Sequence, residues 1–80
     1  MAEYPDKRGV IVEVSTGSAY VLFSNLYDDV MLEVDDDGLD LDEALLNDQI
    51  ETVSGPHPSV REATNWCATA GWVVEETVKA

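Results

Sequence analysis

Negative charge is crowded into the middle of this chain, and that crowding limits what the chain can fold into. Eleven of the 24 residues from Asp28 to Glu51 are Asp or Glu, and no Lys or Arg occurs from Gly9 to Val60. The sequence as a whole has 17 acidic and four basic residues, for a formal net charge of −13. Because like charges repel and weaken the compact state, so concentrated a block calls for a functional reason. Basic proteins suit it as partners, whereas nucleic acid and anionic membranes do not.

The length of 80 residues predicts one compact domain, residues 1–80, with a thin core. A chain this short buries only about 60 to 65 per cent of the surface that its unfolded form exposes. Apolar residues make up 45% of the sequence, enough for one sheet packed against one or two helices but not for a deep cleft. We therefore expect neither a large buried active site nor catalytic residues.

Four segments have the β-branched and alternating character of strands. Residues 9–14 and 19–23 flank the turn residues Ser15 to Ser18 and predict a hairpin, which residues 29–34 extend into a three-stranded meander. Residues 72–78 predict a last strand that returns to the sheet. The expected fold class is α+β, with a small antiparallel sheet.

Two helices are predicted in the second half. Asp40 is a candidate N-cap with Glu43 three residues on, as in a capping box, before the apolar residues of 41–45. A short extended piece is expected at 49–53, and Pro58 suits the first turn of the next helix. The small apolar residues of that helix recur at helical spacing and Gly71 is placed to end it; they are Val60, Ala63, Cys67 and Ala70.

The predicted strands place acids on the side of the sheet that faces away from the core. If Val10, Val12 and Val14, with Val30, Leu32 and Val34, face the core, then Glu13, Glu33 and Asp35 face outward. Carboxylates on one strand face recur every ~6.6 Å, which is of the same order as the ~3.4 Å between phosphates along one DNA strand. The geometry permits mimicry of nucleic acid. The predicted partner-binding residues are Glu13, Asp28, Asp29, Glu33, Asp35, Asp36, Asp37, Asp40, Asp42 and Glu43.

Motifs for metal or cofactor chemistry are incomplete. Glu33 to Gly38 resembles the start of an EF-hand loop, but the bidentate Glu needed at position 12 is Ala44, so a turn is the better interpretation. One histidine, His57, and one cysteine, Cys67, cannot supply the four ligands of a structural zinc site. We expect no cofactor and no metal, with His57 in an exposed loop and Cys67 as a small buried hydrophobe.

The single cysteine also bears on location. It cannot form an internal disulfide, and the sequence shows neither a secretory signal nor an apolar span of about 20 residues. A reducing compartment, the cytoplasm, is therefore expected. The oligomeric state stays open between monomer and homodimer.

In its small size, acidity and α+β pattern the chain resembles the anti-CRISPR proteins encoded by bacteriophages, several of which imitate the charge of nucleic acid. The resemblance covers the whole chain in size and composition and involves no shared motif. It implies a CRISPR effector as partner, a type I crRNA-guided surveillance complex whose basic DNA channel would accept residues 28–51, and a site of action in the host cytoplasm.

Three other function classes remain open. An immunity protein or antitoxin would use an acidic face to cover the active site of a basic nuclease toxin. A housekeeping protein adapted to high salt would be acidic without any charged partner. Its acids should then be spread evenly over the chain, whereas the only acidic residue in residues 55–71 is Glu62. A small enzyme would need a pocket that shifts carboxylate pKa values.

Overall fold

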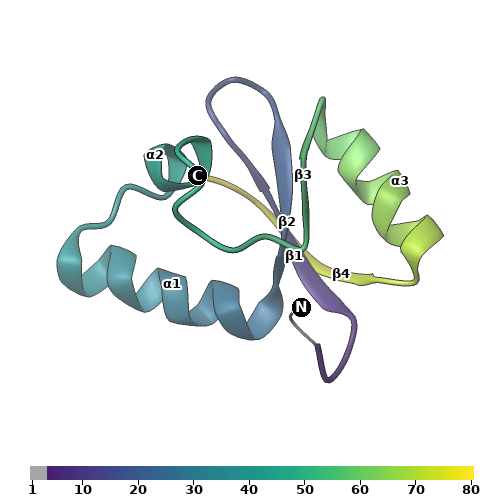
Figure 1. The fold of residues 1–80 in the computed structure, drawn as a ribbon, viewed down its shortest axis with the longest axis horizontal. Helices are drawn as coiled ribbons and strands as arrows, with labels where there is room; N and C mark the ends of the chain where they lie inside the picture. The colour runs from purple at the N-terminus through teal and green to yellow at the C-terminus, as the bar shows by residue number, and fades with distance from the viewer. Residues whose placement is uncertain (1–3) are drawn as a thin grey trace.

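The computed structural model describes residues 4–80, which form a four-stranded mixed sheet and three helices (Figure 1). Along the sheet the strands lie in the order β3-β2-β1-β4. In chain order the elements are β1 (Arg8–Glu13), β2 (Ala19–Phe23), α1 (Ser24–Asp37), α2 (Leu41–Leu46), β3 (Ser54–His57), α3 (Val60–Ala70) and β4 (Val73–Lys79). The α+β fold class expected from the sequence is confirmed.

The β1–β2 hairpin is the centre of the sheet and is buried on both faces. Its strands pair antiparallel from Gly9 opposite Phe23 to Glu13 opposite Ala19. Val10, Ile11 and Val12 are consecutive and at most 3% exposed, so side chains pointing in opposite directions are all covered. A strand that is apolar on both faces needs a layer of packing on each side.

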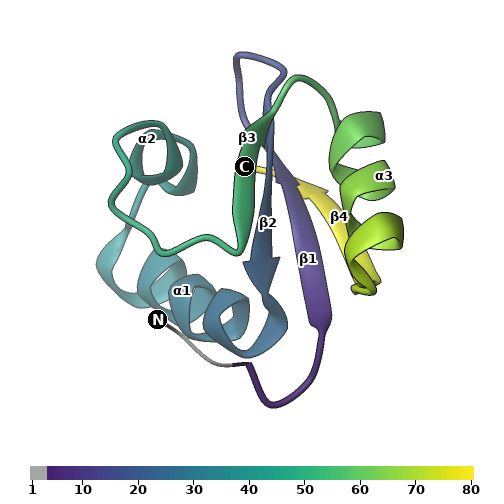
Figure 2. The ribbon, with the colours of Figure 1, turned by 45° about the vertical axis from the view of Figure 1, so that its right-hand side comes forward.

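Helices supply those two layers, as Figure 2 shows with α1 and α2 on one side of the sheet and α3 on the other. The first layer packs on the core that includes Val10, Val12 and Leu22, together with Leu41 and Leu45 of α2. The second packs on Ile11 and Val21, with Ala63 and Cys67 of α3. We call these the α1/α2-face core and the α3-face core.

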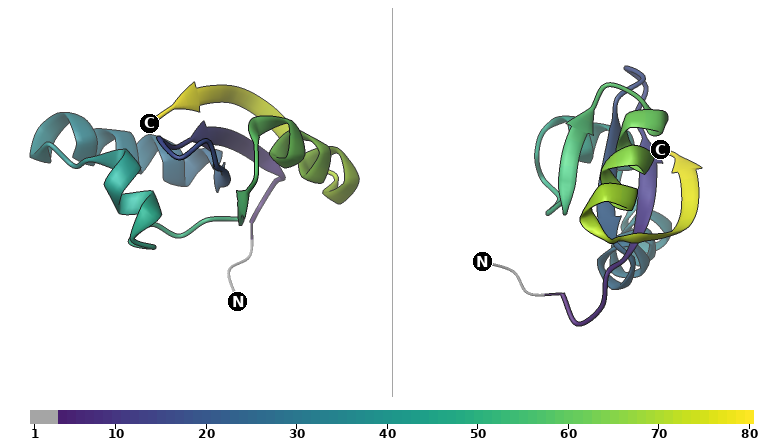
Figure 3. Two further views of the ribbon diagram at one scale, coloured as in Figure 1. Left: turned by 90° about the horizontal axis from the view of Figure 1, so that it is seen from above. Right: turned by 90° about the vertical axis from the view of Figure 1, so that its right-hand side faces the viewer.

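The edge strands are joined through α3, which lies between them in the right-hand view of Figure 3. This connection carries the chain from β3 at one edge to β4 at the other in the same direction, so β4 pairs parallel with β1. The expectation of an antiparallel sheet was therefore wrong for this edge. A crossover helix returns the chain in the same direction, so the two strands that it connects run parallel even at opposite edges of the sheet.

A bulge in β4 decides which way its side chains point. Gly9 is opposite Val74, but the next pair is Val10 with Glu76, so Glu75 is the extra residue. As a result Val74 packs on the α3-face core and Val78 on the α1/α2-face core, although an even spacing would put both on one face.

The predicted third strand at 29–34 was wrong, because these residues belong to helix α1. Val30, Leu32 and Val34 alternate as strand residues would, but in the helix Leu32 is turned about 200° from Val30. Val30 is 6% exposed and Leu32 is 61% exposed. The segment forms a helix rather than a strand because its apolar residues then share one face that covers the sheet; they are Leu26, Tyr27, Val30, Met31 and Val34.

The other predicted elements differ in detail. The strands predicted at 9–14, 19–23 and 72–78 are confirmed, and their ends agree to within one residue. The N-cap at Asp40 and the end of α3 at Gly71 are also confirmed. The extended piece expected at 49–53 is instead β3, at Ser54–His57, which tolerates Gly and Pro because it lies at an edge. Pro58 precedes α3 rather than opening it, since Ser59 is the N-cap.

None of the helices found within residues 4–80 has the length and apolar character needed to cross a membrane.

The assignment of α1 predicts unequal effects for two apolar residues two positions apart. Val30→Ala should lower the free energy of unfolding by about 2 kcal/mol, because it empties space in the α1/α2-face core. Leu32→Ala should change it by less than about 0.5 kcal/mol, because that side chain is mostly in solvent. Urea denaturation followed by tryptophan fluorescence measures both, and equal losses would contradict the helix.

Candidate functional site: an acidic helix

Helix α1 gathers more carboxylates on one surface than any other element of the fold. Its apolar side lies on the sheet, and the rest of its surface carries six acids, all exposed. We call this surface the α1 acidic face; it consists of Asp28, Asp29, Glu33, Asp35, Asp36 and Asp37. The helix begins directly after β2 at Ser24 and ends at Gly38, which adopts a left-handed conformation (φ 70°).

An exposed leucine stands in the middle of this surface. On a helix the nearest neighbours of Leu32 are three and four residues away, and all four of them are aspartates: Asp28, Asp29, Asp35 and Asp36. Leu32 is one of three large apolar residues in the described part of the chain that are exposed. An apolar side chain ringed by charge can enter a partner's pocket while the surrounding carboxylates meet basic side chains.

The charge of α1 runs against the electrostatics of a helix. The carbonyl end of a helix carries partial negative charge and favours cations, each worth about 0.3–1 kcal/mol. The last turn of α1 instead holds Asp35, Asp36 and Asp37 and no basic residue, while its first turn holds no acid. Stability alone therefore does not account for these three aspartates.

The acids of α2 have a second task. Asp40 caps this helix, its Oδ1 accepting a hydrogen bond from the Glu43 backbone N–H at 3.3 Å. Asp42 Oδ1 accepts one from the backbone N–H of Ser15 at 2.7 Å, which ties α2 to the β1–β2 turn. Of the three predicted site residues on α2 and its cap, only Glu43 is exposed and makes no side-chain hydrogen bond within the described residues, so the first role of Asp40 and Asp42 is structural.

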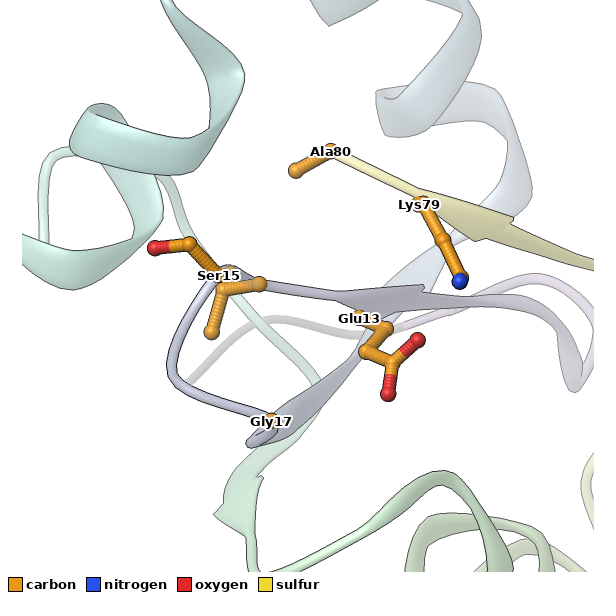
Figure 4. Close-up of a pocket in the computed structure, with 6 residues that line it drawn as sticks. Glu13, Ser15, Gly17, Lys79 and Ala80 are labelled. Carbon is orange, nitrogen blue, oxygen red and sulfur yellow. The ribbon is translucent and has the colours of Figure 1, made fainter.

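Glu13 lies apart from the α1 acidic face. It ends β1 opposite Lys79 of β4, and the two side chains border an open hollow of about 270 Å³ that also includes Ser15 and Gly17 (Figure 4). Within the described residues no side-chain hydrogen bond or ion pair joins Glu13, Ser15 and Lys79, so the hydroxyl is not coupled to a base in this structure. The structure thus brings six of the ten predicted site residues together on α1 and leaves Glu13 elsewhere.

Little of the acidic charge is compensated within the chain. Within residues 4–80 one ion pair lies inside 4 Å, and it joins Arg8 Nη1 to Glu75 Oε2 at 3.9 Å, far from α1 in sequence. It is exposed and contributes little to stability. Counter-charge for the α1 acidic face therefore has to come from salt or from a partner.

The residues with reactive or ligating chemistry lie on other elements. Cys67 is 1% exposed in the α3-face core, and burial raises the pKa of its thiol, which keeps it protonated and unreactive. His57 was expected in an exposed loop, but it is half-buried in β3 with Nε2 2.8 Å from Ser54 Oγ. Across residues 4–80, no three or more His, Cys, Asp or Glu side chains are grouped so that they could hold a metal ion.

A scan against protein-family models, a search of curated proteins and a search of solved structures each returned no match. The functional argument therefore rests on the geometry and charge of the chain.

Sequence reasoning located the acids but missed Leu32. Strand alternation placed Leu32 in the core beside Val30 and Val34, whereas the helix exposes it among the acids. The signal was present in the four aspartates at positions three and four residues away, which a helical rather than an alternating pattern would have revealed.

The bond from Ser15 to Asp42 predicts a structural role for one acid of the block. Asp42→Ala should lower the free energy of unfolding by about 1 kcal/mol, because it removes a hydrogen bond to a charged acceptor. Asp42→Asn keeps the Oδ1 acceptor and should lose less. Urea denaturation compares both with Asp36→Ala, which makes no such bond and should not destabilise; equal losses in all three variants would refute the role.

The aspartates at the carbonyl end of α1 predict that removing their charge will stabilise the fold. Replacing Asp35, Asp36 and Asp37 with Asn should raise the free energy of unfolding by about 1–2 kcal/mol at low salt, because it removes three anions from the carbonyl end of α1. The gain should shrink in 1 M NaCl, where the Debye length is about 3 Å. Thermal or urea unfolding at the two salt concentrations checks this, and a loss of stability at low salt would contradict it.

Proposed function

We propose that this chain is an inhibitory binding protein whose α1 acidic face occupies a positively charged nucleic-acid-binding site. In its most specific form the proposal is an anti-CRISPR that blocks target DNA binding by a type I crRNA-guided surveillance complex. It binds rather than catalyses, needs no cofactor, and acts in the cytoplasm of the host cell. The observation that carries the proposal is the cluster of six exposed carboxylates on a single helix.

The linear charge density of α1 is close to that of nucleic acid. A helix rises ~1.5 Å per residue, so the six carboxylates between Asp28 and Asp37 span about 13.5 Å, or about one charge every 2–3 Å. Duplex DNA carries one charge per ~1.7 Å of axis and each of its strands one per ~3.4 Å. A row of Lys and Arg spaced for phosphates would therefore meet carboxylates at a similar density.

The location of the acids favours a binding face over a solvating surface. Helix α3 carries one acid, Glu62, beside Arg61, and β4 carries two, one of which pairs with Arg8. On α1 the acids are concentrated, and three of them oppose the helix dipole. A protein adapted only to high salt has no reason for this arrangement.

An immunity protein or antitoxin is the second candidate, and Leu32 is the observation that favours it. A mimic of the phosphate backbone needs charge alone, whereas a plug for the catalytic cleft of a basic nuclease toxin gains from an apolar side chain at its centre. Both candidates share the α1 acidic face and differ in the partner that it covers.

The proposal predicts inhibition that depends on α1. The chain should reduce binding of a labelled target duplex to a purified type I surveillance complex, measured by fluorescence anisotropy. Replacing Asp35, Asp36 and Asp37 with Asn should weaken the inhibition at least tenfold, equivalent to about 1.4 kcal/mol, because three charges leave the binding face.

The matched control removes the same charge elsewhere. Asp6→Asn, Glu62→Gln and Glu75→Gln together also delete three negative charges, all at exposed positions outside α1 and the loop beside it, and should weaken inhibition by less than about twofold. Equal effects of the two triple variants would mean that net charge, not α1, drives binding. Absence of inhibition together with tight binding to a basic nuclease would replace the anti-CRISPR with the immunity protein.

A further inference from the structure

A second hollow, of about 210 Å³, lies where α1 meets the loop before β3. Its apolar lining comes from Leu26 and Val30 of α1 and from Ile50 of the loop. Val30 and Ile50 are 6% and 9% exposed and belong to the α1/α2-face core. The floor of the hollow is therefore part of the packed core.

The loop that forms the far wall is held at both ends. The backbone N–H of Gln49 donates to the carbonyl of Ala44 at 2.8 Å, and that of Val53 donates to the carbonyl of Val21 at 2.7 Å. These bonds join the loop to α2 and to β2. The hollow is thus formed before any partner arrives, which lowers the entropy cost of filling it.

The polar lining is acidic and comes from two separate segments. Asp29 and Glu33 lie one turn apart on α1, and Glu51 comes from the loop. No Lys, Arg or His is among the described residues that line it. Burial, and after it the negative charge of Glu51, raise the pKa of the Tyr4 hydroxyl.

This combination selects one kind of occupant. A compact metal ion does not fit, because these carboxylates are not grouped as metal ligands in the part of the chain that is described. An apolar floor beside carboxylates suits a cation carried on a hydrocarbon stem. Among natural side chains arginine matches best, because its guanidinium presents five donors in a planar fork and is weakly hydrated.

We propose that this hollow receives an arginine side chain of the partner, with the methylene stem on Leu26, Val30 and Ile50 and the guanidinium among Asp29, Glu33 and Glu51. The inference rests on the proposed function, since it takes the partner to be a basic protein. It adds a specific anchor to a surface otherwise defined by charge: a desolvated arginine at the edge of the α1 acidic face is the kind of contact that dominates interface energy.

The test uses small probes on the intact 80-residue protein, so it needs no identified partner. Amide resonances are followed by two-dimensional NMR during titration with N-butylguanidinium, N-butylammonium or guanidinium. N-butylguanidinium should shift the amides of Gln49, Ile50 and Glu51 saturably and bind most tightly. Guanidinium, which lacks the stem, should produce small shifts spread over all acidic segments.

Two variants, each lacking one negative charge, distinguish binding in the hollow from general electrostatic attraction of the cationic probe to the acidic protein. Glu33→Gln should weaken N-butylguanidinium binding by about fivefold, because it removes a carboxylate that lines the hollow. Glu62→Gln, which removes an equal charge from α3 on the other side of the sheet, should leave binding within about 1.5-fold of the unaltered protein. Shifts spread evenly over α1, or equal weakening by both variants, would overturn the inference.

The outcome is separable from that of the proposed function. If the chain blocks DNA binding by the surveillance complex but the probe does not settle in the hollow, the arginine inference fails and the acidic-face mechanism stands. If the probe binds in the hollow but the chain inhibits no nucleic-acid-binding protein, the proposed function fails and the hollow remains a guanidinium site.

Discussion

The β1–β2 hairpin is apolar on both faces, and both faces have to be covered. Consecutive residues such as Ile11 and Val12 are fully buried although they point to opposite sides of the sheet. Helix α3 covers one side, and its connection also sets the parallel direction of β4. Covering the other takes α1, and a helix that lies on a sheet with its apolar side must turn its remaining side to solvent. The core therefore requires that one side of α1 face the solvent, but it does not require that this side be acidic.

That surface works against the stability of the helix that carries it. Three aspartates crowd the carbonyl end of α1, no cation lies in its last turn, and the ion pair found within residues 4–80 is on the β1–β4 edge. Each of these features is unfavourable or neutral for folding. Residues that oppose stability and have no structural contact are typical of binding sites, where local rules are broken for function. In contrast Asp40 and Asp42 help to hold α2, so acidic composition alone does not identify a binding residue.

Much of the fold could be predicted because local signals were consistent. The turn before Ala19, the N-cap at Asp40 and the glycine that ends α3 each have a mechanism confined to a few residues. Residues 29–34 could not be assigned that way, because an apolar run of this length fits both a strand and a helix. The choice depends on whether the sheet accepts a third antiparallel strand or a covering helix, which is a long-range property. The same ambiguity hid Leu32, whose exposure depends on the helical assignment.

The dependence of affinity on salt tests the central claim most directly. Binding of the chain to a purified type I surveillance complex would be measured from about 50 to 200 mM NaCl, for the unaltered protein and for the variant with Asn at positions 35, 36 and 37. If carboxylates of α1 replace phosphates on basic side chains, affinity should fall steeply with salt and the variant should show a clearly shallower slope. The same slope for both proteins would contradict the account, because Asp35, Asp36 and Asp37 would then take no part in the contact.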